Sequence, residues 1–180
     1  MAAAARLFNG VGYFRTDSNR IAREAGYAPG TFYVHFADKL DIFLEVYRWW
    51  ADLEWQVIDA ALSPSASRAS ENTRVAKAVL QHHREWRTFR RSLRALTATD
   101  ERVHEARVKE RQRQISQTVD LMRSRGVRQT ASRIYTSLLL FEILCDAVAD
   151  GDTEVLGIGE RDIVARLAAE VGELLGSGDE

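Results

Sequence analysis

The stretch EAGYAPGTFYVHFADK, residues 24–39, interrupts a chain that otherwise favours helix. Gly26 stands where the C-terminus of a helix needs a residue with positive φ. Pro29 suits the first turn of a new helix, because the N–H that proline lacks has no partner there. A helix over NRIAREA, residues 19–25, is therefore expected to end at Gly26, and a second short helix follows. Two helices joined by a tight turn form a helix-turn-helix, whose second helix can enter the major groove of DNA.

The second helix of this motif carries side chains suited to DNA contacts. Its start, residues 28–30, is small and lets the backbone approach phosphates and base edges closely. Phe32 and Phe36 recur at i and i+4 and are expected to face the core. Spacing alone leaves open a plain helical hairpin with core aromatics, because the six basic and five acidic residues of 1–48 make a weak charge for a DNA binder. Groups that can anchor phosphates follow at Thr31, Tyr33, His35 and Lys39.

Composition and patterning predict an all-α fold. The 180 residues are 46% hydrophobic and include two prolines, so the chain can bury a core and form long helices. No run reaches the roughly 18 apolar residues of a membrane helix, and the first residues lack a secretory signal, so a cytoplasmic location without membrane contact is expected. A long amphipathic helix is expected over residues 38–62, a linker over 63–72, and further helices near 73–84, 86–98, 100–125, 129–150 and 160–176.

The N-terminal region contains a set of residues at characteristic spacing: LFN at 7–9, Gly12-Tyr13, Thr16, IAREAG at 21–26, GTFYVHF at 30–36 and Asp38-Lys39. With these residues it closely resembles the DNA-binding region of the TetR (tetracycline repressor-like) family. The resemblance implies an N-terminal three-helix helix-turn-helix domain, residues 1–45, joined by the long helix to a C-terminal helical domain, residues 46–180, with about nine helices in all. It also implies a homodimeric, ligand-responsive repressor that binds a palindromic operator in double-stranded DNA and a small-molecule effector of unknown identity.

The resemblance assigns roles to residues of the motif. Thr16 is expected to cap the second helix of the domain as well as to contact phosphate. Val34 departs from the family pattern, in which a basic or larger polar residue is frequent, and a valine reads at most an apolar feature such as a thymine methyl. Ser18 departs too, because the family usually buries an apolar residue there. The residues expected to contact DNA are Thr16, Ala28, Pro29, Gly30, Thr31, Tyr33, Val34, His35 and Lys39.

Two apolar stretches near the C-terminus are candidates for a subunit interface. LLLFEILCDAV, residues 138–148, is apolar almost all round, and the final helix carries a regular apolar stripe. Two such helices from each subunit can pair as a four-helix bundle, although the same residues also fit an intramolecular core. The predicted interface comprises Leu138, Phe141, Cys145, Ile163, Leu167, Val171 and Leu174.

Two acidic residues fall inside apolar stripes, Glu54 in the long helix and Glu142 in the apolar run. Because an unpaired buried carboxylate is costly, each needs a partner or solvent. One interpretation places both in an effector pocket, and the alternative pairs them with the arginines of residues 84–128 or exposes them. The predicted pocket comprises Trp49, Glu54, Trp86, Phe89, Met122, Tyr135, Phe141 and Glu142.

The arginine-rich run HHREWRTFRRSLR, residues 82–94, mixes basic and aromatic residues. On a helix its apolar residues recur at core spacing, which predicts a buried stripe with the arginines on a solvated face. An additional nucleic-acid surface is the alternative. The predicted stripe comprises Trp86, Phe89, Leu93 and Leu96.

Signatures of catalysis and of metal binding are incomplete. Glu101 and His104 have the Glu-x-x-His spacing of di-iron bundles, but the sequence lacks the second copy that such a site needs. No phosphate-binding loop, dinucleotide fingerprint or nucleophile elbow occurs, so neither a cofactor nor enzyme activity is expected. The competing hypothesis is a helical small-molecule-binding or protein-interaction module with the same fold but weak DNA binding.

Overall fold

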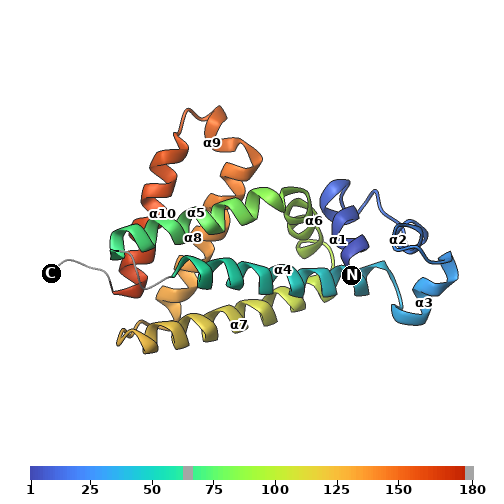
Figure 1. Ribbon diagram of the computed structural model, residues 1–180, viewed down its shortest axis with the longest axis horizontal. Helices are drawn as coiled ribbons and strands as arrows, with labels where there is room; N and C mark the ends of the chain where they lie inside the picture. The colour runs from blue at the N-terminus through green and yellow to red at the C-terminus, as the bar shows by residue number, and fades with distance from the viewer. Residues whose placement is uncertain (63–66, 177–180) are drawn as a thin grey trace. The chain divides into compact units, whose positions relative to one another are not determined.

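Helices make up all the regular structure in residues 1–62 and 67–176, the part of the chain that the computed structural model describes (Figure 1). The predicted all-α class is confirmed there, with ten α-helices where about nine were expected. Within the described residues, none of these helices is both long enough and apolar enough to cross a membrane. In chain order the elements are α1 (Ala2–Gly10), α2 (Ser18–Glu24), the 3-10 turn η1 (Pro29–Thr31), α3 (Phe32–His35), α4 (Lys39–Ala61), α5 (Arg68–Glu85), α6 (Arg87–Thr97), α7 (Glu101–Ser124), α8 (Ala131–Asp150), α9 (Asp152–Val155) and α10 (Glu160–Leu175).

The helices pack as two units, each of which is discontinuous in sequence. The first unit comprises Met1–Leu53 and Trp86–Glu110, and the second comprises Glu54–Glu85 and Arg111–Glu180 as far as they are described. The divisions fall inside α4 and α7, so these two helices contribute residues to both units. The predicted domain boundary between residues 45 and 46 stays a prediction.

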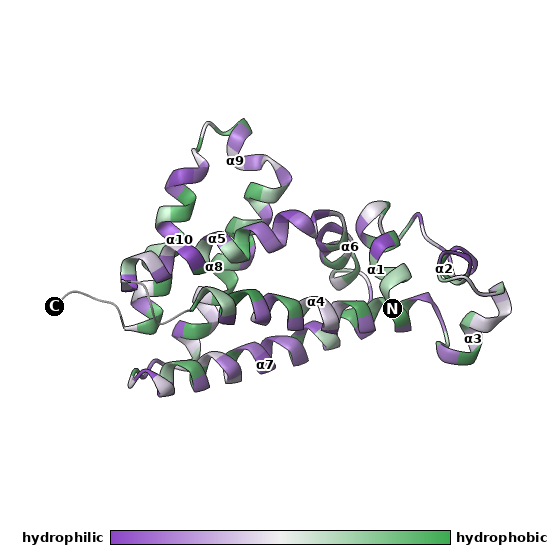
Figure 2. Cartoon of the chain, viewed as in Figure 1, coloured by the Kyte–Doolittle hydropathy of each residue, from purple (hydrophilic) through white to green (hydrophobic). Residues whose placement is uncertain are grey.

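Aromatic rings form the centre of the first unit. The ring of Phe43 contacts those of Phe8 and Phe89 at centroid distances of 5.2 and 5.0 Å, and all three side chains are fully buried. Burying each of them contributes about 1.5–3 kcal/mol. Helix α6 reaches this core through Phe89, Leu93 and Leu96, which confirms the predicted stripe, and Figure 2 shows the alternation of hydrophilic and hydrophobic residues along the helices.

Arg90 is an exception on the basic face of α6. Its side chain is 2% exposed, and its guanidinium carbon lies 4.8 Å from the ring centroid of Trp50. The predicted solvated arginine face is therefore wrong at Arg90, whereas Arg87 and Arg91 are exposed. A guanidinium suits this place because it is weakly hydrated and stacks on aromatic faces.

Three helices of the second unit, α5, α8 and α10, pack against one another (Figure 1). Leu80, Ile134 and Leu167 are almost fully buried in the core of this unit. A single copy of the chain also buries most of the predicted interface residues, as the intramolecular alternative expected. A subunit contact through these helices would instead use side chains that remain exposed on them. The buried residues are Cys145, Ile163, Leu167, Val171 and Leu174, and the half-buried ones are Leu138 and Phe141.

The predicted linker over residues 63–72 is partly wrong. Residues 63–66 lie outside the described part of the chain, but α5 already begins at Arg68. The reason is non-local, because Glu71 is 6% exposed and both of its carboxylate oxygens accept hydrogen bonds from the guanidinium of Arg125, at 2.7 and 3.0 Å. These bonds lower the pKa of Glu71 although burial opposes the shift.

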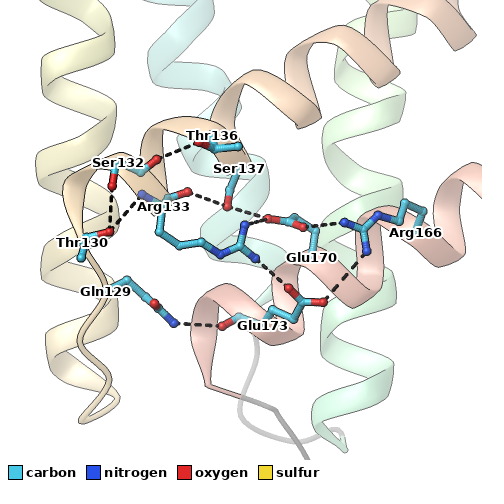
Figure 3. A network of polar contacts seen from close by, with 9 residues as sticks. All are labelled: Gln129, Thr130, Ser132, Arg133, Thr136, Ser137, Arg166, Glu170 and Glu173. Atoms are coloured by element: carbon cyan, nitrogen blue, oxygen red, sulfur yellow. Dashed lines mark hydrogen bonds and ion pairs between the residues drawn. The ribbon is translucent and has the colours of Figure 1, made fainter.

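A polar network joins α8 to α10 in the second unit (Figure 3). Glu170 is 1% exposed, and its Oε1 accepts from the hydroxyl of Ser137 at 2.6 Å and pairs with Nη1 of Arg133 at 2.6 Å. Its Oε2 accepts from Arg166 at 3.2 Å, and Glu173 pairs with Arg133 at 2.8 Å. Burial raises the pKa of Glu170, but the hydrogen bonds from Ser137 and Arg133 outweigh it, so the pKa is lowered. The carboxylate is therefore charged and well supplied with donors.

Candidate nucleic-acid interface

The turn between α2 and η1 ends the first helix as the sequence predicts. Gly26 has φ of +82°, its N–H donates to the carbonyl of Arg23 at 3.0 Å, and the N–H of Tyr27 donates to the carbonyl of Ala22 at 2.9 Å. This pair of bonds is the Schellman motif, which satisfies the last carbonyls of a helix and requires a left-handed residue. Pro29 then opens η1, also as predicted.

The second helix of the motif is short and strongly two-sided. It begins as η1 and continues as the four residues of α3, in which Phe32 is the buried member at 5% exposed. Phe36, at a ring centroid distance of 5.5 Å from Phe32, packs half-buried against the same core. On the other side Tyr33 is 61% and Val34 77% exposed, and His35 is exposed as well. The aromatic pair thus holds a helix whose remaining side chains are open to a partner.

The small residues before α3 are open too. Ala28, Pro29 and Gly30 are exposed, and Thr31 is half-buried. Seven of the nine residues expected to contact DNA therefore lie on one continuous segment, residues 28–35. Thr16 and Lys39 are the other two.

Thr16 has a structural role that differs from the predicted one. Asp17, rather than Thr16, caps α2, because its Oδ1 accepts from the N–H of Arg20 at 2.7 Å. Thr16 is 3% exposed, and its hydroxyl donates to the carbonyl of Gly12 at 2.8 Å. The expected capping role of Thr16 is wrong, because its side chain is turned into the preceding loop.

Lys39 also serves the loop that precedes α2. Its ammonium donates to the carbonyls of Tyr13 and Thr16 at 3.0 and 2.8 Å and lies 3.9 Å from the ring centroid of Tyr13. Burial lowers the pKa of Lys39, while Asp17 acts in the opposite direction. Two of the three N–H donors of the ammonium are thus engaged within the chain, so a phosphate would share Lys39 with this loop.

Sequence reasoning missed exposed cations beside the motif. Arg15, Arg20 and Arg23 are exposed around α2, and Nη1 of Arg20 donates to the carbonyl of Arg15 at 3.3 Å. Tyr27, in the turn, is 62% exposed. The basic residues were visible in the sequence, and their positions in the first helix of the motif and just before it are the signal that could have found them.

The predicted effector residues divide between the two units. Trp49, Trp86 and Phe89 belong to the first unit, where Trp86 packs edge-on against Trp49 at 5.5 Å and against Phe89 at 5.8 Å. Phe89 is fully buried and Trp86 packs half-buried against the same core, whereas Trp49 is 39% exposed. The other five residues belong to the second unit.

Glu54 lies in a buried polar cluster of the second unit. Nδ1 of His83 is 2.8 Å from Oδ1 of Asp146, and Nε2 is 3.1 Å from Oε1 of Glu54. Gln114 donates to the other oxygen of Glu54 at 3.4 Å. An imidazole that bridges two carboxylate oxygens can donate to both when both of its nitrogens carry protons. Both buried carboxylates thus have a polar partner within the unit.

Glu142 follows the alternative that pairs it with an arginine. Its carboxylate pairs with Arg111, and both side chains are largely buried. Tyr135 on the same helix is 45% exposed, and Phe141 is half-buried. Among the residues that the structure describes, no group of three or more His, Cys, Asp or Glu side chains is placed to hold a metal ion.

Met122 lies at a cavity of about 490 Å³ in the second unit. Its apolar floor includes Met122 and Ile134, which are 1% and 0% exposed. The exposed residues Arg123, Arg128 and Gln129 line it as well. Buried apolar residues and two arginines, of which Arg123 also pairs with Asp120, therefore line the same cavity, a combination that suits a small organic anion.

Comparison with known families places the N-terminal part of the chain. Residues 1–46 match the family described as bacterial regulatory proteins, tetR family. This range contains the turn, η1 and α3. No curated protein matches the chain in sequence at a significant level.

Solved structures share the architecture of the whole described chain. A regulator from Rhodococcus sp. assigned to the TetR family is 18% identical with a TM-score of 0.74, over 97% of this chain and 95% of its own. A TetR-family transcriptional regulator from Streptomyces coelicolor is 20% identical with a TM-score of 0.69, over 99% and 93%. The fatty acid degradation regulator FadR from Bacillus halodurans is 14% identical with a TM-score of 0.62, over 97% and 90%. At these identities the likeness shows the fold, which is that of TetR-family transcriptional regulators.

Proposed function

We propose that this chain, with the fold of TetR-family regulators and their family signature in residues 1–46, binds a palindromic DNA operator as a homodimer and regulates transcription without enzyme activity. The observation that carries the proposal is the exposed series Tyr33, Val34 and His35 on a helix anchored by Phe32. Such a protein acts where the bacterial chromosome lies, in the cytoplasm. Arg15 and Arg20 are proposed to neutralise phosphates beside α2.

Binding of the full chain to the DNA upstream of its own gene tests the proposal. Fluorescence anisotropy at about 50 to 200 mM salt is expected to show specific binding that weakens as salt rises. Arg20→Gln should reduce the slope of log affinity against log salt by about 1.8, because the homodimer loses one phosphate contact, which accounts for about 0.9, in each half-site. Arg161→Gln, on α10, removes an exposed charge of the second unit and should leave the slope unchanged. Absence of specific binding even at low salt would instead support the helical small-molecule-binding or protein-interaction module.

Homodimer formation is proposed to use the exposed part of α8. Two recognition helices must lie about 34 Å apart to read the half-sites of a palindrome. Ile143 on α8 is a large apolar residue that is 63% exposed in the single copy of the chain. Light scattering on Ile143→Glu should report a monomer, whereas Val155→Glu, at a position 89% exposed on α9, should remain a dimer. Equal masses for the two variants would contradict a contact through Ile143.

Ligand response is proposed to reside in the second unit. The cavity lined by Met122, Ile134 and Arg128 supports this, because a ligand there can favour one arrangement of the helices over another. The fluorescent organic anion 8-anilinonaphthalene-1-sulfonate is the probe, and Arg128→Gln should weaken its binding several-fold while Arg161→Gln does not. Unchanged binding in Arg128→Gln would remove this cavity as the effector site. DNA binding measured with and without the probe would show whether the ligand releases the DNA or leaves it bound.

A further inference from the structure

The outward face of α3 is apolar at its centre. Successive residues of a helix turn by about 100°, so Val34 lies about 200° around the axis from Phe32, the buried residue of α3. Val34 is accordingly 77% exposed, more than its neighbour Tyr33 at 61%. The part of the helix that points farthest from its own core is therefore an isopropyl group, which has no hydrogen-bonding atom.

The residues around Val34 supply little hydrogen-bonding readout. Residues 28–34 are Ala-Pro-Gly-Thr-Phe-Tyr-Val and contain no Arg, Lys, Asn or Gln, the side chains that read guanine or adenine with two hydrogen bonds. Tyr33 and His35 flank Val34 and can donate to phosphates, which position a protein without reading sequence. A specific contact from the centre of this surface must therefore be an apolar one.

The major groove offers one apolar feature that distinguishes base pairs, the C5 methyl group of thymine. We infer that Val34 reads a thymine methyl in each half-site of the operator. This inference rests on the proposed DNA-binding function and specifies its substrate as an operator with a thymine opposite Val34. Covering one methyl group with apolar surface corresponds to about a fourfold change in affinity, and a palindrome presents two such contacts, or about fifteenfold per dimer.

The test first selects an operator from random duplexes with the full chain. Each thymine of the selected operator is then replaced by deoxyuridine, which removes the methyl group and keeps the base pairing. One symmetric pair of thymines should lose about fifteenfold in affinity when replaced. The affinity of Val34→Ala should no longer fall when uracil replaces thymine at that pair, since the two changes remove the same contact, and its response at other thymines should be unchanged. Val155→Ala, a matched exposed valine on α9, should behave as the unchanged protein.

The outcomes separate this inference from the function on which it rests. Failure to select any operator at low salt overturns the DNA-binding proposal and the inference with it. Selection of an operator in which no thymine is sensitive to uracil overturns the inference and leaves DNA binding standing. Persistence of the sensitivity in Val34→Ala also overturns it, because another side chain would then contact the methyl group.

Discussion

Replacing Glu170 by glutamine tests the network that joins α8 to α10. The change keeps the size of the side chain and an oxygen that can accept from Ser137, but it removes the negative charge. Arg133 and Arg166 then face a neutral amide, and one of the two terminal atoms that accepted a hydrogen bond becomes a donor. The folded state should therefore lose stability through these two ion pairs.

The magnitude follows from the exposure of the partners. Breaking a fully buried pair costs about 3–5 kcal/mol, because the remaining charge is left buried. Here Arg133 and Arg166 are 30% and 53% exposed, and Arg133 keeps Glu173, so water and Glu173 recover part of that loss. We expect Glu170→Gln to lower the free energy of unfolding by about 2 kcal/mol, which for a chain of this size corresponds to about 4–8 °C in the melting temperature.

Glu173→Gln provides the matched control. Glu173 shares Arg133 with Glu170 but is 57% exposed, and an exposed pair contributes about 0.2–1 kcal/mol. Thermal unfolding of both variants, followed by circular dichroism at one protein concentration and neutral pH, separates the two positions. Equal melting temperatures for Glu170→Gln and Glu173→Gln would refute the reasoning, because burial would then not govern the contribution of the network.

Three further predictions concern other parts of the chain. Gly26→Ala should destabilise the fold by about 1 kcal/mol in urea unfolding, since alanine is strained at φ of +82°, whereas Gly30→Ala, which has open space and no positive φ, should not. Lys39→Met should lower the free energy of unfolding by about 2 kcal/mol in the same assay, because two partly buried hydrogen bonds from a charged donor are lost. The pKa of Glu71 is lowered in the folded state, so its contribution to the free energy of unfolding is present above the unfolded pKa of about 4.3 and is lost as pH falls through the folded value. The difference in stability between the unchanged chain and Glu71→Gln should therefore be constant from pH 7 to about pH 5 and shrink below about pH 5.

Each of these predictions has an opposing result. Equal losses in Gly26→Ala and Gly30→Ala would mean that the turn is not strained by a Cβ atom. Unchanged stability of Lys39→Met together with weakened DNA binding would contradict the loop role and favour the phosphate role that the family resemblance implies. A gap for Glu71→Gln that widens as the solution is acidified would contradict the pairing with Arg125.

Local chemistry explains why the turn and the helix class could be predicted from sequence. Gly26 and Pro29 act through their own backbone preferences, and the structure confirms that α2 ends before Gly26 and that η1 begins at Pro29. The spacing of Phe32 and Phe36 likewise identified the buried face of α3, because helical periodicity needs no knowledge of distant residues. The exposed residues of the candidate interface follow directly from that face.

Long-range partners explain the predictions that failed. Glu71 looked like part of a linker because its partner, Arg125, stands 54 residues away. Arg90 looked solvated because Trp50, on another helix, covers it. In both cases the side chain was assigned to a linker or to solvent, although it contacts a distant part of the same chain. The bonds from Lys39 to the carbonyls of Tyr13 and Thr16 are also long-range, and its expected contact with phosphate stays a prediction.

The discontinuity of the first unit bears on how the chain is made. A ribosome that has released residues 1–53 has delivered the whole helix-turn-helix, but α6, with Phe89 and Leu93, is still to come. At about 5–20 residues per second, synthesis needs several seconds to reach Glu110, and Phe43 lacks its packing partner Phe89 during part of that time. The proposed DNA-binding surface is thus synthesised before α6, which completes the core of its unit, and the aromatic side chains of that core lack this cover on the nascent chain in between.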